Sequence, residues 1–366
     1  MTRSHNKINE VGSKINEFGG MYNIYGNATL VICAAAASGS KEGFLHNFDP
    51  IVTFDDSMDI RLPVTLSNGV KGRITYFQFP DKLRNGWRLE PADSRGWILQ
   101  EVLLAPRSII FGSSTLRWRC LTETDVSGDS GLLKCRWNEI ASGMVEPLMA
   151  WIQMVEVYTV RHFGKKRDIL NACSGIAIKY REACKKVGRD PGYYLAGLWQ
   201  HDFNSLALWA IVNKKPVTKK PKKKSDEDDE DSTFRASSWS WASTDGGVEY
   251  RQPFSNGHGR GLAKILRVPD AVSNQTFDKP VAQAALTIEG HLVPGSDLPI
   301  WPHNKSTCRY YMDTAEANGY KFDWLFLKSS AGIIVKKTRV GYHRIGVFFL
   351  SKDHRQISTR SKIVLL

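Results

Sequence analysis

Apolar residues recur at two different spacings along this chain, and the spacing changes near its middle. They repeat every three or four positions from Leu148 to Tyr158 and again from Ile169 to Cys184. Such a repeat places apolar side chains on one face of a helix. Earlier runs rich in β-branched and aromatic residues, at 29–33, 73–79 and 108–111, have the composition of strands. The first half is therefore predicted to be mixed α/β, with two packed helices.

The second half carries short strand-like runs separated by turn residues. They occupy 284–288, 324–327, 332–336 and 342–350. These runs predict a β-rich carboxy-terminal region. The chain shows no repeat of fixed period, which argues against a solenoid or a propeller.

A pair of tryptophans stands at the start of this second half. Trp239 and Trp241 alternate with serines, and Asp245-Gly246-Gly247 follows as a turn signal. The alternation predicts a strand in a hairpin, with both indoles on one face. Paired tryptophans can stack on a base or a sugar, but packing in a core is their commoner use.

The sharpest change in composition is the charged segment 213–233. Seven lysines lie between Lys214 and Lys224, and six consecutive acids follow at 226–231. Such charge blocks cannot bury apolar surface, so we expect a disordered linker here. The chain then divides into an α/β region at 1–125, a helical region at 126–212, the linker at 213–233 and a β-rich region at 234–366.

Composition is that of a soluble globular protein. The chain has 366 residues, of which 42% are hydrophobic and 24% charged, and its net charge is +13. Basic charge permits attraction to nucleic acid, but no zinc finger, RRM signature or helix-turn-helix pattern accompanies the lysines. Nucleic-acid binding therefore remains only the third of three functional hypotheses.

The sequence predicts an intracellular protein. Six cysteines include no C-x-x-C pair, and the longest apolar run, Leu30 to Ala37, is far shorter than the roughly 20 residues that span a bilayer. The polar amino terminus lacks a signal-peptide pattern. We expect a cytoplasmic protein with no membrane partner. The run Lys219 to Lys224 resembles a nuclear-import signal, so a nuclear location is a second expectation.

The stretch from Arg95 to Arg107 predicts a short buried helix that ends at Pro106. Its apolar residues, Trp97 among them, surround the helix almost completely. Gln100 and Glu101 must then find partners in or beside the core, and the two flanking arginines are the nearest candidates. Glu101 is either a structural carboxylate neutralised by arginine or a site carboxylate with a perturbed pKa. The sequence alone leaves both interpretations open.

Other catalytic patterns are missing from the sequence. It contains no H-E-x-x-H, no G-x-S-x-G, no Walker A loop and no G-x-G-x-x-G after a strand, and we expect no cofactor and no metal. The glycine-rich run 257–261 is interpreted as a loop. His201 and Asp202 are adjacent and would suit a general-base pair if their side chains met.

These segments, taken together, resemble a known family. The helix 95–107, followed by Ile109-Ile110-Phe111 and Trp118-Arg119-Cys120, resembles the closing block of the fungal heterokaryon-incompatibility (HET) domain. Residues 17–37 are similar to that family's helix with a glutamate, a methionine and an Ile-Tyr pair, which precedes a strand of small residues. Segments that follow the domain in many HET proteins are matched in the same order, at 151–158, 168–177, 195–199, 239–246, 286–293 and 342–348. The resemblance marks as family-motif residues Met21, Ile24, Tyr25, Arg95, Trp97, Gln100, Glu101, Arg107, Trp239, Trp241, Asp245 and Gly246.

The chain departs from the family at its start. A strand block ending in Tyr-x-Trp-Gly and a block with Asp-x-x-Cys-Ile-x-Gln normally open the domain, and neither occurs here. The resemblance thus implies a partial, TIR-like HET domain over 1–125, truncated at its amino terminus. By the family's likeness to TIR domains, some of which cleave NAD with a helix-borne glutamate, Glu17 is the only catalytic candidate.

The resemblance implies a role in non-self recognition and in the cell death that follows fusion of incompatible fungal cells. The first hypothesis is a protein that works by contact with other incompatibility or signalling proteins, including copies of itself. The second is a TIR-like hydrolase with NAD as substrate, and the third is the nucleic-acid binder.

Overall fold

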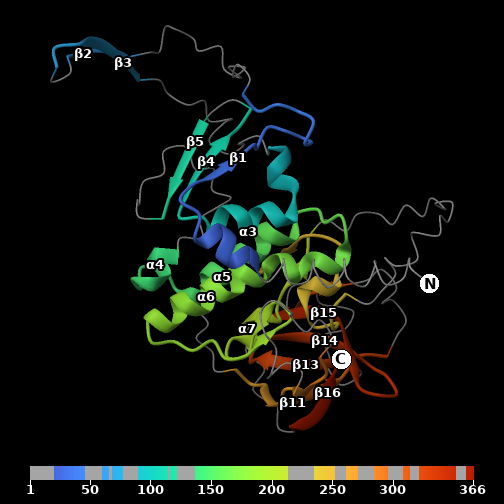
Figure 1. Cartoon of the computed structure of the whole chain (residues 1–366). Coiled ribbons are helices and arrows are strands. Elements are labelled where there is room, and N and C mark those ends of the chain that lie inside the picture. The colour runs from blue at the N-terminus through green and yellow to red at the C-terminus, as the bar shows by residue number, and fades with distance from the viewer. Residues whose placement is uncertain are drawn as a thin grey trace, which may run out of the picture.

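The structure is a computed structural model, and it combines a small amino-terminal sheet, a layer of helices and a large carboxy-terminal sheet (Figure 1). This mixed α/β class with a β-rich carboxy-terminal region is the one that the sequence predicts. Glu17, the charged segment 213–233 and the loop 257–260 lie outside the described residues. The structure describes residues 20–45, 60–65, 68–76, 90–113, 116–121, 137–212, 235–251, 261–270, 284–295, 308–313, 321–351 and 360–366.

The amino-terminal sheet has the strand order β1-β4-β5. Its strands are β1 (Val31–Cys33), β4 (Arg107–Phe111) and β5 (Leu116–Cys120). β1 runs parallel to β4, and β4 runs antiparallel to β5. The helix α3 (Gly96–Leu104), preceded by the 3-10 turn η2 (Pro91–Ser94), packs on one face of this sheet, where Val102 and Ile110 share a small buried cluster. A separate hairpin, β2 (Ile60–Thr65) with β3 (Lys71–Tyr76), belongs to the connection between β1 and α3.

Helices form the middle layer. They are α4 (Trp137–Ala141), α5 (Pro147–Thr159), α6 (Ser174–Lys186) and α7 (Phe203–Leu206), with the 3-10 turns η4 (Lys166–Ile169) and η5 (Asn171–Cys173) before α6. At the start of α5, Pro147 takes the first helical position and the Glu146 carboxylate accepts the Met149 N–H at 2.9 Å. The helix predicted from Leu148 to Tyr158 is confirmed. The run from Ile169 starts in 3-10 turns and becomes α-helical only at Ser174.

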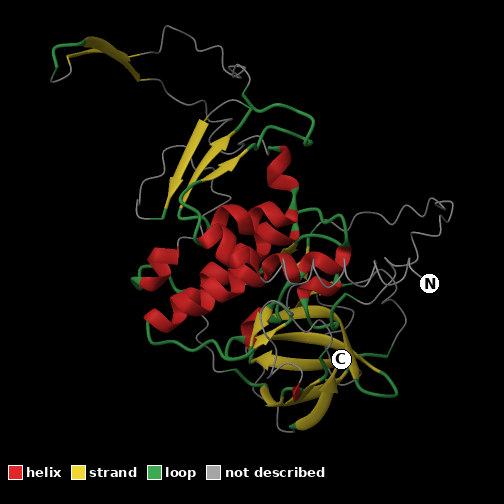
Figure 2. Ribbon diagram, in the orientation of Figure 1, coloured by secondary structure: helices red, strands yellow, loops and turns green. Residues whose placement is uncertain are grey.

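The carboxy-terminal sheet has seven strands and closes on itself. They are β10 (Lys264–Arg267), β11 (Leu286–Pro294), β12 (Cys308–Met312), β13 (Asp323–Lys328), β14 (Ala331–Lys337), β15 (Tyr342–Leu350) and β16 (Ser361–Leu365). Because β16 pairs with both β11 and β15, the strands β11, β13, β14, β15 and β16 form a ring. Figure 2 shows these strands curled below the helices.

Alternate residues of β13, β14 and β15 are buried on both sides of the sheet. Leu325 and Val347 belong to the large core that also contains residues of the helices. Trp324, Phe326 and Phe348 belong to a second cluster on the opposite face. Burial on both faces gives the continuous apolar runs that marked these strands in the sequence.

One hydrophobic core extends from the helices into the carboxy-terminal sheet. The same cluster of buried residues contains Trp151 of α5, Tyr180 of α6 and Ile363 of β16. The short strands β8 (Ala210–Ile211) and β9 (Val248–Glu249), which flank the charged segment, pair with each other. The two sides of the charged segment therefore belong to one packed body.

The predicted strand and hairpin around Trp239 and Trp241 are wrong. This segment is a turn followed by the 3-10 helix η7 (Trp241–Ser243), whose start is capped by the Ser240 hydroxyl accepting the Ala242 N–H at 3.1 Å. Ser240 caps the turn, and the buried Trp239 and Trp241 stand on either side of it in the sequence. This order of large, small and large residues is also the pattern of a strand. The interpretation as core tryptophans holds, since Trp239 and Trp241 are both buried.

Candidate functional site

The carboxy-terminal end of α3 is closed by side chains that come from other segments. Arg119 Nη1 donates to the Val102 carbonyl at 2.7 Å, and Trp137 Nε1 donates to the Leu103 carbonyl at 2.9 Å. Both contacts satisfy carbonyls that have no partner within the helix, and the positive charge suits this end of the helix dipole. The arginine buried against the end of α3 is therefore Arg119 of β5. Arg107, one of the two that the sequence suggested, is exposed at the start of β4.

Gln100 ties α3 to α6. Its side-chain oxygen accepts the Gly175 N–H at 2.8 Å, so it caps the first turn of α6. A Cβ at Gly175 would lie 2.8 Å from that oxygen and 2.8 Å from Leu104 Cδ1, so a larger residue there would require the Gln100 and Leu104 side chains to move. The role of Gln100 is structural, and it joins two segments that carry the family resemblance.

Glu101 meets Tyr25 of the helix at 20–26, and the Tyr25 hydroxyl donates a hydrogen bond to its carboxylate. Burial raises the pKa of Glu101, while this hydrogen bond and the charge of Arg95 act against the rise. Burial and the charge of Glu101 in turn raise the pKa of Tyr25 to about 12. Of the two arginines expected beside Glu101, only Arg95 acts on it. The structure thus brings together Tyr25, Arg95 and Glu101 from two separate motif segments.

Cys33 lies next to this group, at the end of β1. Burial, followed by the charges of Asp93 and Glu101, raises its pKa to about 11, against the opposing effects of Arg117 and Arg161. A thiol and a phenol with these pKa values stay protonated at neutral pH, and protonated groups are poor nucleophiles. We call Tyr25, Cys33, Arg95, Glu101 and Arg161 the α3 cluster. Its chemistry fits a half-buried structural centre better than a nucleophile with its base.

Trp97 is half-buried, whereas the sequence predicted a buried side chain. Its indole donates to the Asp168 carboxylate in η4. Burial raises the pKa of Asp168, and this hydrogen bond acts against the rise. On the preceding helix, Met21 is partly buried while Ile24 is 60% exposed. These motif residues therefore surround α3 without pointing to a common ligand.

The carboxyl ends of the parallel strands β1 and β4 are occupied by the chain itself. Ligands of open α/β sheets bind at such ends. Here the Ala36 N–H donates to the Phe111 carbonyl at 3.0 Å, and the Ala92 N–H donates to the Ala35 carbonyl at 3.1 Å. The buried Glu90 carboxylate accepts both the main-chain N–H of Ser113 at 2.8 Å and its hydroxyl at 3.0 Å. An internal carboxylate thus fills the position where a polar ligand would bind.

Three of the later motif segments, 151–158, 195–199 and 239–246, meet at Gly197. The Gly197 carbonyl accepts Trp241 Nε1 at 2.9 Å and Trp151 Nε1 at 3.1 Å. Gly197 has φ +97°, and a Cβ there would lie 2.5 Å from the Trp241 ring, so only glycine fits. The neighbouring Ala196 carbonyl accepts the Ser240 hydroxyl at 2.6 Å. This junction packs indoles and offers no open aromatic surface for a base.

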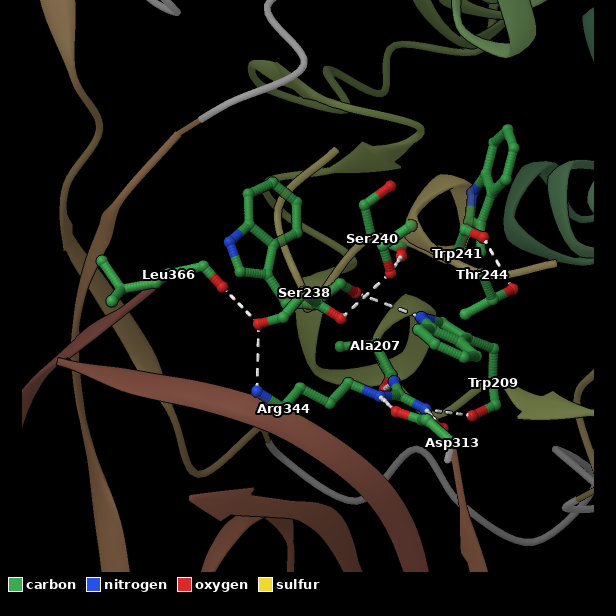
Figure 3. A network of polar contacts seen from close by, with 11 residues as sticks. Ala207, Trp209, Ser238, Ser240, Trp241, Thr244, Asp313, Arg344 and Leu366 are labelled. Atoms are coloured by element: carbon green, nitrogen blue, oxygen red, sulfur yellow. Dashed lines mark hydrogen bonds and ion pairs between the residues drawn. The ribbon is translucent and has the colours of Figure 1, made fainter. Parts of the chain in front are cut away.

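Arg344 is the central residue of a second polar network (Figure 3). Its side chain is fully buried and pairs with Asp313 at 2.9 Å. Its guanidinium also donates to the Ala207 and Trp209 carbonyls, each at 2.5 Å. The Arg344 main-chain N–H donates to the Ser238 hydroxyl at 3.0 Å, and that hydroxyl donates to the main-chain oxygen of Leu366. One arginine of β15 thus holds three distant segments together.

The remaining sequence candidates lie apart from both networks. Asp245 pairs on the surface with Arg235 at 2.8 Å and Lys166 at 3.2 Å. Burial alone would raise the Asp245 pKa, but these two cations outweigh it and the pKa is lowered. Gly246, next to it, has φ 140° and lies in a bend.

His201 and Asp202 do not form a general-base pair. The Asp202 carboxylate binds Arg189 Nη2 at 2.6 Å, whereas His201 Nδ1 contacts the Asp190 carbonyl at 2.6 Å. The two adjacent side chains therefore have different partners.

Sequence reasoning missed Arg344, Arg119 and Glu90. The local patterns around Arg119 and Glu90 indicate ordinary exposed charges. The partners of all three residues lie far away in sequence, as Ala207 does from Arg344, at a separation of 137 residues. The one local signal was the arginine inside an apolar strand at Tyr342–Leu350.

Within the described ranges, no group of three or more His, Cys, Asp and Glu side chains is placed to hold a metal ion. The helices of the same ranges include none with the length and apolar composition needed to cross a membrane.

Comparison of the chain with protein-family models, with curated proteins and with solved structures finds no match in any of the three.

Proposed function

We propose that this chain is a HET-like protein that acts in non-self recognition and in the cell death that follows fusion of incompatible fungal cells. In this proposal it works through contacts with other incompatibility or signalling proteins rather than through catalysis. The order of the matched segments along the sequence is the basis for the family, and the α3 cluster is the basis for the mode of action.

The observation that carries the mode of action is the pairing of Glu101 with Tyr25. A catalytic carboxylate needs access to substrate and a partner with a matched pKa. The partner of Glu101 is a phenol with its pKa raised to about 12, and the neighbouring thiol of Cys33 has its pKa raised to about 11. Neither group is prepared for proton transfer near neutral pH, which supports a structural role for the cluster.

The proposal is tested by inducible expression of the full chain in a filamentous fungus, with viability followed by a vital dye. We expect loss of viability with the wild-type chain and with Glu101→Gln, which keeps the shape of the side chain. Trp241→Ala, which removes a buried indole, should abolish the effect by unfolding the protein. Val340→Ala, at a side chain that is 75% exposed, is the matched neutral control.

Two results would contradict the proposal. If Glu101→Gln accumulates to wild-type levels and melts at the wild-type temperature but no longer kills, Glu101 has a direct chemical role. If the wild-type chain accumulates and viability is unchanged both in single strains and after fusion with strains of different genotype, the assignment to cell death is wrong.

A further inference from the structure

We propose that the outer face of the sheet β1-β4-β5 binds an amphipathic helix of a partner protein, one with acidic residues beside its apolar stripe. The inference rests on the proposed function in one respect, because it names the partner class of a protein that acts by contact.

The register places three large apolar residues in one row across the sheet. Ile32 of β1 stands beside Ile109 of β4, and Ile109 stands opposite Trp118 of β5. Directly opposed residues share a face, so these three side chains point the same way. Ile32 is 59% exposed and Trp118 is 42% exposed, and this face is therefore open to solvent.

The neighbouring row extends the same apolar surface. Phe111 stands opposite Leu116, which is 54% exposed. The Phe44 ring packs edge-on against Phe111, with the ring centroids 5.0 Å apart, and the adjacent Leu45 is 78% exposed. Contiguous apolar patches of this kind on a protein surface commonly mark interaction sites.

The opposite face of the sheet β1-β4-β5 is covered by α3, so the two faces of the sheet differ in burial. Ile110 and Cys33 pack with Val102 of α3, and Arg119 reaches the end of that helix. The described helices lie below and to the right of these strands in Figure 2. All-parallel sheets are covered by helices on both faces, and in this mixed sheet the described helices cover one.

The size of the face selects a helix rather than a second copy of the chain. The sheet has one strand of three residues and two of five, so its face spans about 14 Å by at most about 17 Å, or no more than roughly 240 Å². A stable dimer interface buries about 800 Å² per partner, so this face alone is too small to hold a dimer. One helix, about 10 Å across and about 16 Å long over three turns, matches its dimensions.

The charge of the face selects an acidic helix. Arg107, exposed at the start of β4, lies in the row next to Ile109 and is opposed to Cys120. It is the only charged side chain among the strand residues of this face, because Arg117 and Arg119 point to the opposite one. A carboxylate beside the apolar stripe of the partner helix would pair with Arg107. The net charge of +13 on the chain also favours an acidic partner.

The test uses the full chain and a displayed library of 15-residue peptides with helical apolar spacing and randomised flanking charges. Selection against the wild-type chain should enrich peptides with apolar residues at i, i+3, i+4 and i+7 and with Glu or Asp beside them. The binding of the enriched peptides is then measured by fluorescence anisotropy. We expect Ile32→Glu and Trp118→Glu each to weaken binding at least tenfold, and Arg107→Glu to shift the preference towards basic flanks.

Val340→Glu is the control, because it places the same charge at an exposed apolar residue outside the sheet β1-β4-β5, and it should leave peptide binding unchanged. Enriched peptides without helical spacing, or binding that Ile32→Glu and Val340→Glu reduce equally, would overturn the proposal. So would a wild-type dimer in light scattering that Trp118→Glu dissociates, because the occupant would then be a second copy. Since the measurement uses purified protein and peptide, failed peptide binding together with retained cell killing would remove this inference and leave the proposed function standing.

Discussion

The guanidinium carbon of Arg344 lies 3.3 Å from the centre of the Trp209 ring. The cation therefore stacks on an indole of the segment that leads into β8 while its other side pairs with Asp313. Burial lowers the Arg344 pKa, and Asp313 acts in the opposite direction. A fully buried charge is tolerated only where pairing and hydrogen bonds replace its hydration, and Arg344 has both.

We expect Arg344→Ala to destabilise the protein by about 3–5 kcal/mol, because it removes from the core the cation that pairs with Asp313 and donates to two main-chain carbonyls. This is a large fraction of the roughly 5–15 kcal/mol that stabilises a typical domain. Urea denaturation followed by circular dichroism measures the loss. Arg339→Ala, at an exposed arginine in the turn between β14 and β15, should stay within about 0.5 kcal/mol of wild type. Equal midpoints for the two variants would show that the buried pair adds nothing.

Replacing a tryptophan with alanine should lower the free energy of unfolding by an amount that depends on how deeply the indole is buried. Trp199 is fully buried and its ring lies 5.5 Å from that of Trp151 and 5.3 Å from that of Tyr180, so Trp199→Ala should cost about 3–5 kcal/mol. Trp97→Ala should cost less, because the indole is half-buried and loses one hydrogen bond, to Asp168. Trp118→Ala should cost least. Chemical denaturation of the three variants gives the order, and a Trp118 loss as large as that of Trp199 would mean that the outer sheet face is covered.

The elements that the sequence predicted are those whose signal is local. The helix α5 repeats its apolar residues with helical spacing and starts with proline, and β13 to β15 are continuous apolar runs bounded by turns. In each case the side chains that form the element are also those that bury it. Local pattern and tertiary packing then give the same answer.

The candidate site was less predictable, because its contacts join distant segments. Glu101 was singled out, but its partner Tyr25 lies on another helix, and nothing local distinguishes Arg95 from Arg107 as its neighbour. The Trp239–Trp241 alternation was misread because Ser240 uses its side chain to cap a 3-10 turn, and a cap and a strand leave the same pattern of small and large residues.

The α3 cluster predicts a dependence of stability on pH. Burial raises the native pKa of Glu101 above its ordinary 4.5, so between 4.5 and the native pKa the folded state binds more protons than the unfolded state. Stability must therefore fall as pH rises through this window. Glu101→Gln should remove this component of the fall. Denaturation midpoints between pH 4 and pH 8 test it, and an unchanged slope in the variant would contradict the assignment.

A second variant tests the cause of that pKa. The Tyr25 hydrogen bond lowers the pKa of Glu101, so Tyr25→Phe should raise it further. A ¹³C NMR titration of the glutamate side chains reads this directly. Tyr22→Phe is the matched control, because Tyr22 lies on the same helical segment and donates to Glu182 instead, at 2.7 Å. A Glu101 titration that moves equally in both variants would show that the shift comes from the helix rather than from the hydrogen bond.

The charged segment should be dispensable for folding. Its flanks are held together by the β8–β9 pair and by the Val212 N–H donating to the Gly247 carbonyl at 2.8 Å. Replacing residues 214–232 with a Gly-Ser linker should therefore leave the melting temperature within a few degrees. Val248→Asp, which places a charge at a buried position of β9, is the destabilising reference. A loss as large as that of Val248→Asp would mean that the segment packs.

The last prediction is that the purified chain does not cleave NAD. The carboxyl ends of β1 and β4, where a nucleotide would bind in an open α/β sheet, are bridged by the Ala92–Ala35 hydrogen bond and occupied by the Glu90 carboxylate on Ser113. Binding a phosphate there would require expelling a buried carboxylate of the same charge. Incubation with NAD, followed by chromatography, should show no loss above a buffer control. Rapid loss that Glu17→Ala abolishes would make the chain a hydrolase, whereas slow loss insensitive to that substitution would come from a contaminating enzyme. Glu90→Gln gives an independent check, since it should leave the background unchanged if the site is closed and should raise turnover if Glu90 alone blocks a working site.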